Sequence, residues 1–327
     1  MDFLLSGSGP MAVIDYGEGV LAVDADYLRP GLAAIHLLIE NGRAAIIDTA
    51  THSASPLVFA ALADKGISPE QVDYIILTHI HLDHAGGAGV LMRQCPNARL
   101  TVHPRGVSHM ADPGRLVAGV SAVYGIERTK EMYGDILPIS SARIVPTPDG
   151  SVVHLAGRPL RFYETPGHAR HHVAVHDEKR TGWVFAGDTF GLSYRELDEG
   201  ERQFVFPTTS PVQFDPIAYH RSIDRVASLA SDALYVTHFS RIHKPREKAD
   251  VLHRLVDAHA ALAVALRHSG ERRPGLLYDA VRALFISEAR RFGSRLSDEK
   301  LLDVYGMDVE LNAQGLDVWL NTSASAA

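Results

Sequence analysis

The chain has 327 residues, of which 46% are hydrophobic and 22% charged, and its formal net charge is −7. This length suffices for one large domain, or for a domain with an appendage, built around a sizeable core. The acidic balance argues against nucleic acid and against an anionic membrane as the main partner. We therefore expect a small-molecule partner, and the sequence leaves a homo-oligomer open.

A single cysteine, Cys95, excludes an internal disulfide and a cysteine-rich zinc site. The first residues contain no cationic segment followed by a long apolar one, so we expect no secretion signal. No stretch approaches the ~18 apolar residues of a membrane span. These features predict a cytoplasmic protein.

Strands and helices are both predicted in the first third of the chain. The strands are expected over residues 19–28, 33–50, 72–79 and 99–104, and the helices over 53–68 and 87–98. Within 33–50, the dipeptide Asn41-Gly42 separates two apolar runs, which is a strong hairpin signal. The run 72–79 is short, apolar and rich in β-branched residues, which is typical of a buried strand.

The pattern changes near residue 108. Residues 108–138 indicate a helical, loop-containing insertion that would act as a cap. Strands are predicted again over 140–168, over 171–189 as a hairpin with a polar turn at 177–180, and over 233–239. Helices follow over 245–269 and 275–292, and the low-complexity tail 321–327 is expected to fray. We therefore expect a catalytic domain over 1–243 and a helical segment over 244–327 packed on it.

The densest group of metal-type side chains lies in the stretch THIHLDHAGG, residues 78–87. His79 and His81 are two positions apart in an extended segment, so their side chains point to the same side and can hold one ion. Asp83 and His84 follow where the chain should turn into a helix, facing a second ion. Imidazole and carboxylate ligands suit zinc, with iron or manganese as alternatives.

Four residues cannot saturate two ions, so other ligands are needed. Three later segments each place one suitable side chain after an apolar strand. These are His168 in TPGH, Asp188 in AGDT and His238 in VTH. Strand ends that each deliver one ligand type are difficult to obtain from histidines scattered at random.

These four elements, in this order, resemble the metallo-β-lactamase-fold hydrolase superfamily, including its lactonase and glyoxalase II-like branches, over roughly residues 12–243. The resemblance implies an α+β, four-layer αββα sandwich, here with additional C-terminal helices. It also implies two half-sites and a bridge: His79, His81 and His168 for one ion, Asp83, His84 and His238 for the other, and Asp188 between them. Asp48 matches an early strand-end aspartate that supports the ligand loop from behind.

Other side chains have two interpretations. His109, at the start of the cap, either lines a substrate cleft or caps a helix. Tyr194 either donates a hydrogen bond to a substrate carbonyl or packs in its loop, and Phe206 either forms a pocket wall or packs. The basic run over 241–248 is either a solvated helix start or a contact for an anionic substrate such as a glutathione thioester.

Two ions about 3.5–4 Å apart share one water and lower its pKa toward ~7, and the resulting hydroxide attacks an electrophilic centre. Asp188 would hold the ions together and Asp83 would orient the hydroxide. No Gly-x-Ser-x-Gly motif is present, which favours direct attack by water over an acyl-enzyme. The favoured function is hydrolysis of a small ester-type bond, in a lactone or a thioester. The alternatives are a phosphodiesterase, a di-iron redox or oxygen-sensing protein, and a non-catalytic scaffold.

Overall fold

The computed structural model describes residues 13–178, 182–230 and 233–324. The expectations for the N-terminal residues, for part of the polar turn at 177–180 and for the end of the tail lie outside these ranges. In the part of the chain that is described, no helix has the length and apolar character needed to cross a bilayer.

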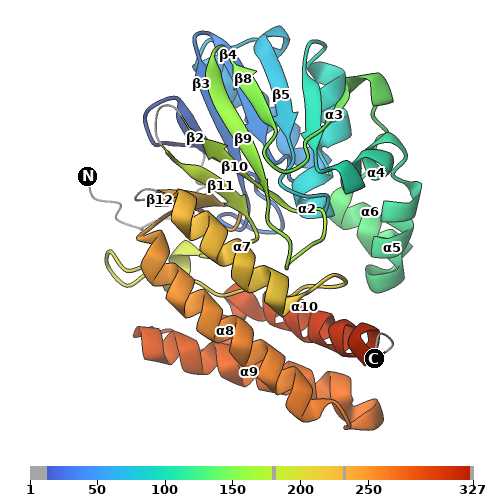
Figure 1. Cartoon of the computed structure of the whole chain (residues 1–327), viewed down its shortest axis with the longest axis vertical. Coiled ribbons are helices and arrows are strands. Elements are labelled where there is room, and N and C mark those ends of the chain that lie inside the picture. Colours follow the sequence, from blue (N-terminus) through green and yellow to red (C-terminus); the bar gives the residue numbers. More distant parts are fainter. Residues whose placement is uncertain (1–12, 179–181, 231–232, 325–327) are drawn as a thin grey trace.

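The described strands form two mixed sheets (Figure 1). The first has the order β1-β2-β3-β4-β5-β6-β7, over Val13–Asp15, Val20–Asp24, Ala34–Glu40, Arg43–Ile47, Val72–Ile76, Arg99–Val102 and Ile144–Pro146. The second has the order β13-β12-β11-β10-β9-β8, with β8 to β13 over Val152–Leu155, Arg158–Glu164, Val173–Asp177, Val184–Gly187, Ala233–Val236 and Ser240–His243. Neighbours are parallel from β4 to β7 and between β11 and β12, and antiparallel elsewhere.

The predicted hairpin at Asn41-Gly42 joins β3 to β4. Glu40 pairs with Arg43, so the loop contains two residues, and their φ angles are 47° and 73°. Positive φ at both central positions is the geometry that matches the twist of the flanking strands, and asparagine and glycine adopt it at low cost. The hairpin sets the register that buries most of β3 and β4.

The two sheets pack face to face around an apolar layer. This layer contains Val20, Leu38, Ala45, Ile47, Ile76, Leu155, Leu160, Phe162, Val173, Val175, Phe185 and Tyr235. Helices α1 (Ser55–Asp64) and α3 (Ala88–Gln94) contact the first sheet, and α7 (Pro216–Leu229) contacts the second. The predicted αββα sandwich is therefore confirmed.

Two groups of helices extend the sandwich (Figure 1). The predicted insertion forms α4 (Val107–Ala111), α5 (Gly114–Tyr124) and α6 (Ile126–Tyr133). The C-terminal segment forms α8 (Pro245–Leu266), α9 (Arg273–Phe292) and α10 (Asp298–Ala324), and α8 packs on α7. The expectation of a frayed tail is wrong for residues 321–324, because α10 continues through them.

The helix α7 and the strand β13 were not predicted. Yet α7 begins with a recognisable signal, because Asp215 accepts a hydrogen bond from the Ala218 N–H and Pro216 occupies the first turn. The strand β13 covers Arg241, which the sequence had suggested to be part of a basic helix start.

Acidification should weaken the packing of α8 through His259. Its Nδ1 donates to the Leu255 carbonyl at 2.7 Å, and its ring packs edge-on against Phe206. Its Nε2 has no hydrogen-bond partner among the described residues. Burial lowers the pKa of His259 from 6.5 to about 4. Between pH 6.5 and pH 4, His259 is protonated in the unfolded chain but still neutral in the folded chain. The free energy of unfolding therefore has its full value above pH 6.5 and decreases as the pH falls toward 4.

We therefore expect His259→Leu to lose less stability than the wild type on acidification. The difference should be about 2 kcal/mol between about pH 7.5 and about pH 5, measured by urea unfolding with a chelator present. His268→Leu, at an exposed position, is the control and should follow the wild type. Parallel pH profiles for wild type and His259→Leu would contradict the prediction.

Candidate metal centre

Strand direction explains why the candidate ligands meet at one edge of the sandwich. Strands β4 and β5 are parallel, and Asp48 and His79 lie just beyond their carboxyl ends. In the other sheet β9, β11 and β12 point the same way, since β9 and β11 both run antiparallel to β10 and β12 runs parallel to β11. His168, Asp188 and His238 follow these three strands.

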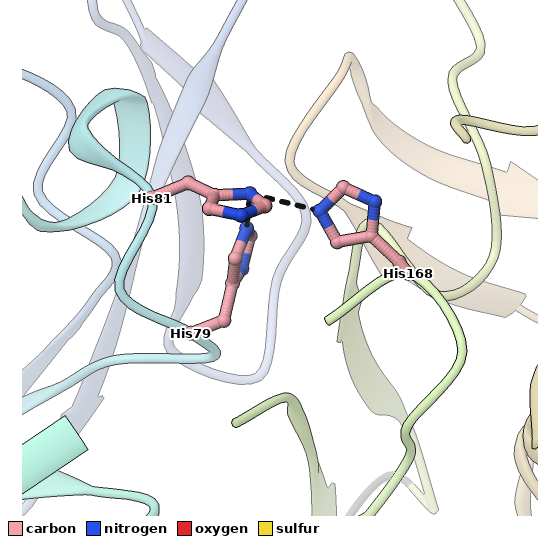
Figure 2. Close-up of side chains that lie close together, drawn as sticks. All are labelled: His79, His81 and His168. Carbon is pink, nitrogen blue, oxygen red and sulfur yellow. Dashed lines mark hydrogen bonds between the residues drawn. The ribbon is translucent and has the colours of Figure 1, made fainter. Parts of the chain in front are cut away.

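One group of three imidazoles comes from His79, His81 and His168 (Figure 2). The Nδ1 atom of His81 lies 2.9 Å from Nε2 of His79 and 3.0 Å from Nε2 of His168. Three nitrogen atoms that converge in this way form one face of a tetrahedral site. The structure thus brings together the three residues of the first predicted half-site.

A second group lies beside the first and comprises Asp83, His84 and His238. Nε2 of His84 is 3.5 Å from an Asp83 oxygen, and Nε2 of His238 is 3.3 Å from the same oxygen. Asp188 lies between the groups, because one carboxylate oxygen is 3.3 Å from His84 Nε2 and the other is 3.6 Å from His168 Nε2. This is the placement expected of a bridging ligand.

The donor atoms fit divalent ions. His84 Nε2 and Asp188 Oδ1 are buried and lie 3.3 Å apart, and among the described residues neither atom has a well-formed hydrogen bond. Buried polar atoms in such a state are costly unless something else satisfies them. Burial would lower the pKa of His84, but the carboxylates of Asp188 and Asp83 outweigh it and raise that pKa well above its ordinary range. The carboxylates thus favour a positive charge at the centre of the cluster, and a bound metal ion would supply that charge.

Hydrogen bonds behind the ligands fix the orientation of the rings. Nδ1 of His238 donates to the Leu32 carbonyl at 2.9 Å, and Nδ1 of His168 donates to the Thr208 carbonyl at 3.4 Å. A proton on Nδ1 leaves Nε2 as the atom with a free lone pair, and it is Nε2 that faces the centre. Such outer partners select the tautomer that binds metal.

Asp48 orients the ring of His84 in the same way, and it also forms hydrogen bonds to residues that follow strands of both sheets. Asp48 is buried, and its carboxylate accepts hydrogen bonds from the Thr78 N–H at 2.9 Å, the Thr78 hydroxyl, the Thr237 hydroxyl at 2.9 Å and His84 Nδ1 at 2.8 Å. Thr78 follows β5 and Thr237 follows β12, so one side chain connects ligand loops from both sheets.

His172 is a buried residue that supports the candidate ligands from behind. Its Nε2 accepts a hydrogen bond from the Asp188 N–H at 3.1 Å, and its Nδ1 contacts the hydroxyls of Thr165 and Thr189. Burial lowers its pKa well below the ordinary range, so the ring is neutral and holds the Asp188 backbone. Its neighbour His171 instead lines a cavity beside the ligands.

That cavity has a volume of about 320 Å³ and reaches the candidate ligands His81, Asp83, Asp188 and His238. Its wall combines the cap, the C-terminal helix α10 and four tyrosines. The cap and α10 contribute Arg115, Leu116, Val120, Val123, Met132, Met307, Asp308 and Leu311, and the tyrosines are Tyr27, Tyr124, Tyr133 and Tyr194. Asp308 has no sequence signal, since it follows no strand and belongs to no motif.

Two of the three candidate pocket residues line the cavity, and the third does not. His109 and Tyr194 line the cavity, and the Tyr194 hydroxyl donates to Asp308 at 3.4 Å. Phe206 lies elsewhere, fully buried against Phe285 of α9. Its packing role therefore accounts for its position.

The basic run lies away from the cavity. Arg241 stacks on the rings of Tyr16 and Trp183, and Lys244 pairs with Glu247 at 3.3 Å. Among the described residues, Arg115 is the one lysine or arginine on the cavity wall.

Comparison with known proteins agrees with this geometry. Residues 28–238 match the metallo-beta-lactamase superfamily. A metallo-beta-lactamase fold-containing protein of Sulfurisphaera tokodaii, ST1585, is 28% identical over 171 residues, or 52% of this chain and 61% of that protein. A hydroxyacylglutathione hydrolase of Stenotrophomonas maltophilia is 29% identical over 165 residues, or 50% of this chain and 48% of that enzyme. The chain thus spans only part of the length of these relatives.

Solved structures extend the likeness in fold to the C-terminal helices. A metallo-beta-lactamase family protein of Thermus thermophilus, TTHA1429, superposes with a TM-score of 0.64 at 23% identity, covering 96% of this chain and 94% of the other. The archaeal protein ST1585 gives 0.63 at 20% identity, covering 92% and 98%. Together with the matched segment and the converging histidines and aspartates, this assigns the chain to the metallo-beta-lactamase superfamily.

Proposed function

We propose that the protein is a metal-dependent hydrolase that cleaves a small ester-type bond, in a lactone or a thioester with an uncharged, apolar acyl group. The observation that carries the proposal is the contact between two groups of three ligand side chains and one largely apolar cavity. The hydrolase names among its relatives, such as the hydroxyacylglutathione hydrolase of Stenotrophomonas maltophilia, support the reaction class.

In this proposal His79, His81 and His168 hold one divalent ion, Asp83, His84 and His238 hold another, and Asp188 bridges them. When bound, the two ions supply Lewis acidity for the scissile carbonyl and lower the pKa of a water molecule toward neutrality. Zinc suits the imidazole and carboxylate donors, and iron or manganese would also be accepted. The chain itself provides the oriented imidazoles, the bridge and a largely apolar cavity beside them.

The wall of the cavity supports an apolar acyl group. Leu116, Val120 and Met132 come from the cap, and Met307 and Leu311 come from α10. Contact with these side chains favours hydrocarbon, at roughly 0.8 kcal/mol for each buried methylene. The basic run over 241–248 lies away from the cavity, and Arg115 alone among the described lysines and arginines lines it, so a glutathione thioester is the less favoured member of the class.

A substrate panel tests the proposal. Protein reconstituted separately with zinc, manganese and iron is assayed against lactones, thioesters and phosphodiesters, with acyl chains of increasing length and with charged acyl groups. We expect hydrolysis of uncharged lactones or thioesters, with kcat/KM rising with chain length. Stoichiometric iron with an oxygen-dependent optical change and no hydrolysis would replace the proposal by the redox alternative.

Tyr194→Phe tests the role of the cavity tyrosine. The ring is held between Tyr305 and the Arg29 guanidinium, so removal of the hydroxyl should leave its position unchanged. If that hydroxyl donates to a substrate carbonyl, kcat/KM should fall about tenfold, the equivalent of one hydrogen bond, while metal content stays the same.

Tyr235→Phe is the matched control, because Tyr235 is buried between the sheets and does not line the cavity. It should retain full activity. Equal activity of Tyr194→Phe and the wild type would assign Tyr194 to packing alone.

A further inference from the structure

A second cluster of metal-type side chains joins α7 and α8, two helices that pack side by side (Figure 1). His220 and Asp224 are four residues apart on α7, and His253 and Asp257 are four residues apart on α8. Residues with this spacing occupy one face of a helix. Both imidazoles are about one quarter exposed, so the cluster is open to ions from solution.

The four side chains form a continuous chain of polar contacts. Nε2 of His220 lies 2.9 Å from an Asp257 oxygen, and Nε2 of His253 lies 2.9 Å from an Asp224 oxygen. The two Nδ1 atoms then lie 2.7 Å apart, and the two ring planes are inclined to each other by only 17°. Each histidine is thus anchored by the carboxylate of the opposite helix.

The protonation of the two imidazoles requires a cation between their Nδ1 atoms. A carboxylate accepts hydrogen bonds, so each Nε2 carries a proton that it donates to an aspartate. A neutral imidazole that is protonated on Nε2 has a bare lone pair on Nδ1. Two such lone pairs at 2.7 Å repel each other unless a cation lies between them. That cation is either one shared proton or a metal ion.

We propose that His220 and His253 bind one divalent transition-metal ion through their Nδ1 atoms, with Asp224 and Asp257 as the carboxylates that orient the rings. Ligating histidines usually donate their other N–H to a carboxylate, and both histidines already do so here. Nitrogen donors select ions such as Zn²⁺, Ni²⁺, Co²⁺ or Cu²⁺ over Mg²⁺ and Ca²⁺. Water would complete the coordination.

The geometry requires only a small adjustment. With zinc–nitrogen distances of about 2.0–2.1 Å and a tetrahedral angle, the two Nδ1 atoms would be about 3.4 Å apart. The rings must therefore separate by about 0.7 Å, which side-chain rotation at the surface can provide. The ion would clamp α7, which packs on the sandwich, to the C-terminal helix α8.

The test counts ions in the full-length protein. Metal-free protein is reconstituted with Zn²⁺ in small excess, desalted and analysed by native mass spectrometry, beside His220→Ala, His253→Ala and the control His154→Ala, which removes an exposed histidine of β8. We expect the wild type and the control to hold one ion more than either cluster variant. This difference does not depend on the number of ions in the candidate active centre.

Ring nitrogen shifts in ¹⁵N NMR provide a second measurement. Zn²⁺ should shift Nδ1 of both histidines while their Nε2–H protons remain. Asp224→Asn with Asp257→Asn keeps both imidazoles and should weaken this binding about 10–100-fold. Equal ion counts in the wild type and the cluster variants, with Nδ1 shifts that do not respond to Zn²⁺, would overturn the proposal and identify the bridging cation as a proton.

Discussion

Asp188→Ala is expected to lower the metal content from two ions to one or fewer and to reduce turnover at least about a thousandfold. Such a loss corresponds to ~4 kcal/mol of transition-state stabilisation. The physical reason is the position of this carboxylate, whose oxygens lie within 4 Å of His84, His168 and His238. Without this carboxylate, each half-site keeps three ligands, but no negative charge between the half-sites offsets the repulsion between the two ions.

Two measurements check this expectation: metal content by elemental analysis and steady-state turnover on the best substrate of the panel. The fold should survive, because the side chain of Asp188 contacts the other candidate ligands and not the sheet cores. Asp303→Ala, which removes an exposed aspartate of α10, should retain both ions and full turnover. Two bound ions in Asp188→Ala would show that the bridge is misassigned.

The candidate ligands could be predicted because they obey a local rule. His168, Asp188 and His238 each follow a strand of the second sheet, and strands of one direction end at one edge. Short motifs therefore carry the information that brings distant residues together. The same rule accounts for Asp48, which follows β4.

The cavity could not be predicted in this way, because its wall depends on how separate helices pack. Leu116 of α5 and Asp308 of α10 line the same space, although nearly 200 residues separate them. Neither belongs to a motif, and the spacing of α10 does not indicate which of its faces meets the cap. Phe206 shows the opposite error. Its aromatic neighbours in the sequence suggested a pocket wall, but in the structure Phe285 of α9 packs against it.

Asp308 has an environment that only the fold creates. Burial, which outweighs the neighbouring positive charges, raises the pKa of its carboxyl to about 7. The group lies at the cavity beside the Tyr194 hydroxyl. A carboxyl that is partly protonated near neutrality can accept or donate a hydrogen bond, so α10 offers a substrate a polar contact beside its apolar side chains Met307 and Leu311.

Asp48→Asn should disable the second half-site while keeping the shape of the side chain. The amide oxygen can replace Oδ1, which accepts from the Thr78 N–H, and the amide N–H₂ then occupies the place of Oδ2 beside His84 Nδ1. Because that amide donates, His84 must accept on Nδ1 and carry its proton on Nε2, the atom that faces the centre. We expect metal affinity at this half-site to fall about 10–100-fold.

Asp48→Ala should add a cost in stability that the asparagine variant largely avoids. It leaves the Thr78 N–H, the Thr237 hydroxyl and His84 Nδ1 buried without their acceptor, and each such group costs ~1–3 kcal/mol. Residue 48 also has a φ of 56°, which aspartate and asparagine tolerate better than alanine. We expect a loss of about 3–5 kcal/mol in the free energy of unfolding of metal-free protein, measured in urea.

The two variants together separate the functions of one carboxylate. If Asp48 acts on the tautomer of His84, Asp48→Asn should lose the second ion with a urea midpoint close to that of the wild type, while Asp48→Ala should lose both the ion and stability. If it acts only as a structural link between the sheets, metal content in each variant should follow its stability. Full metal occupancy in a stable Asp48→Asn protein would show that His84 binds its ion without help from this residue.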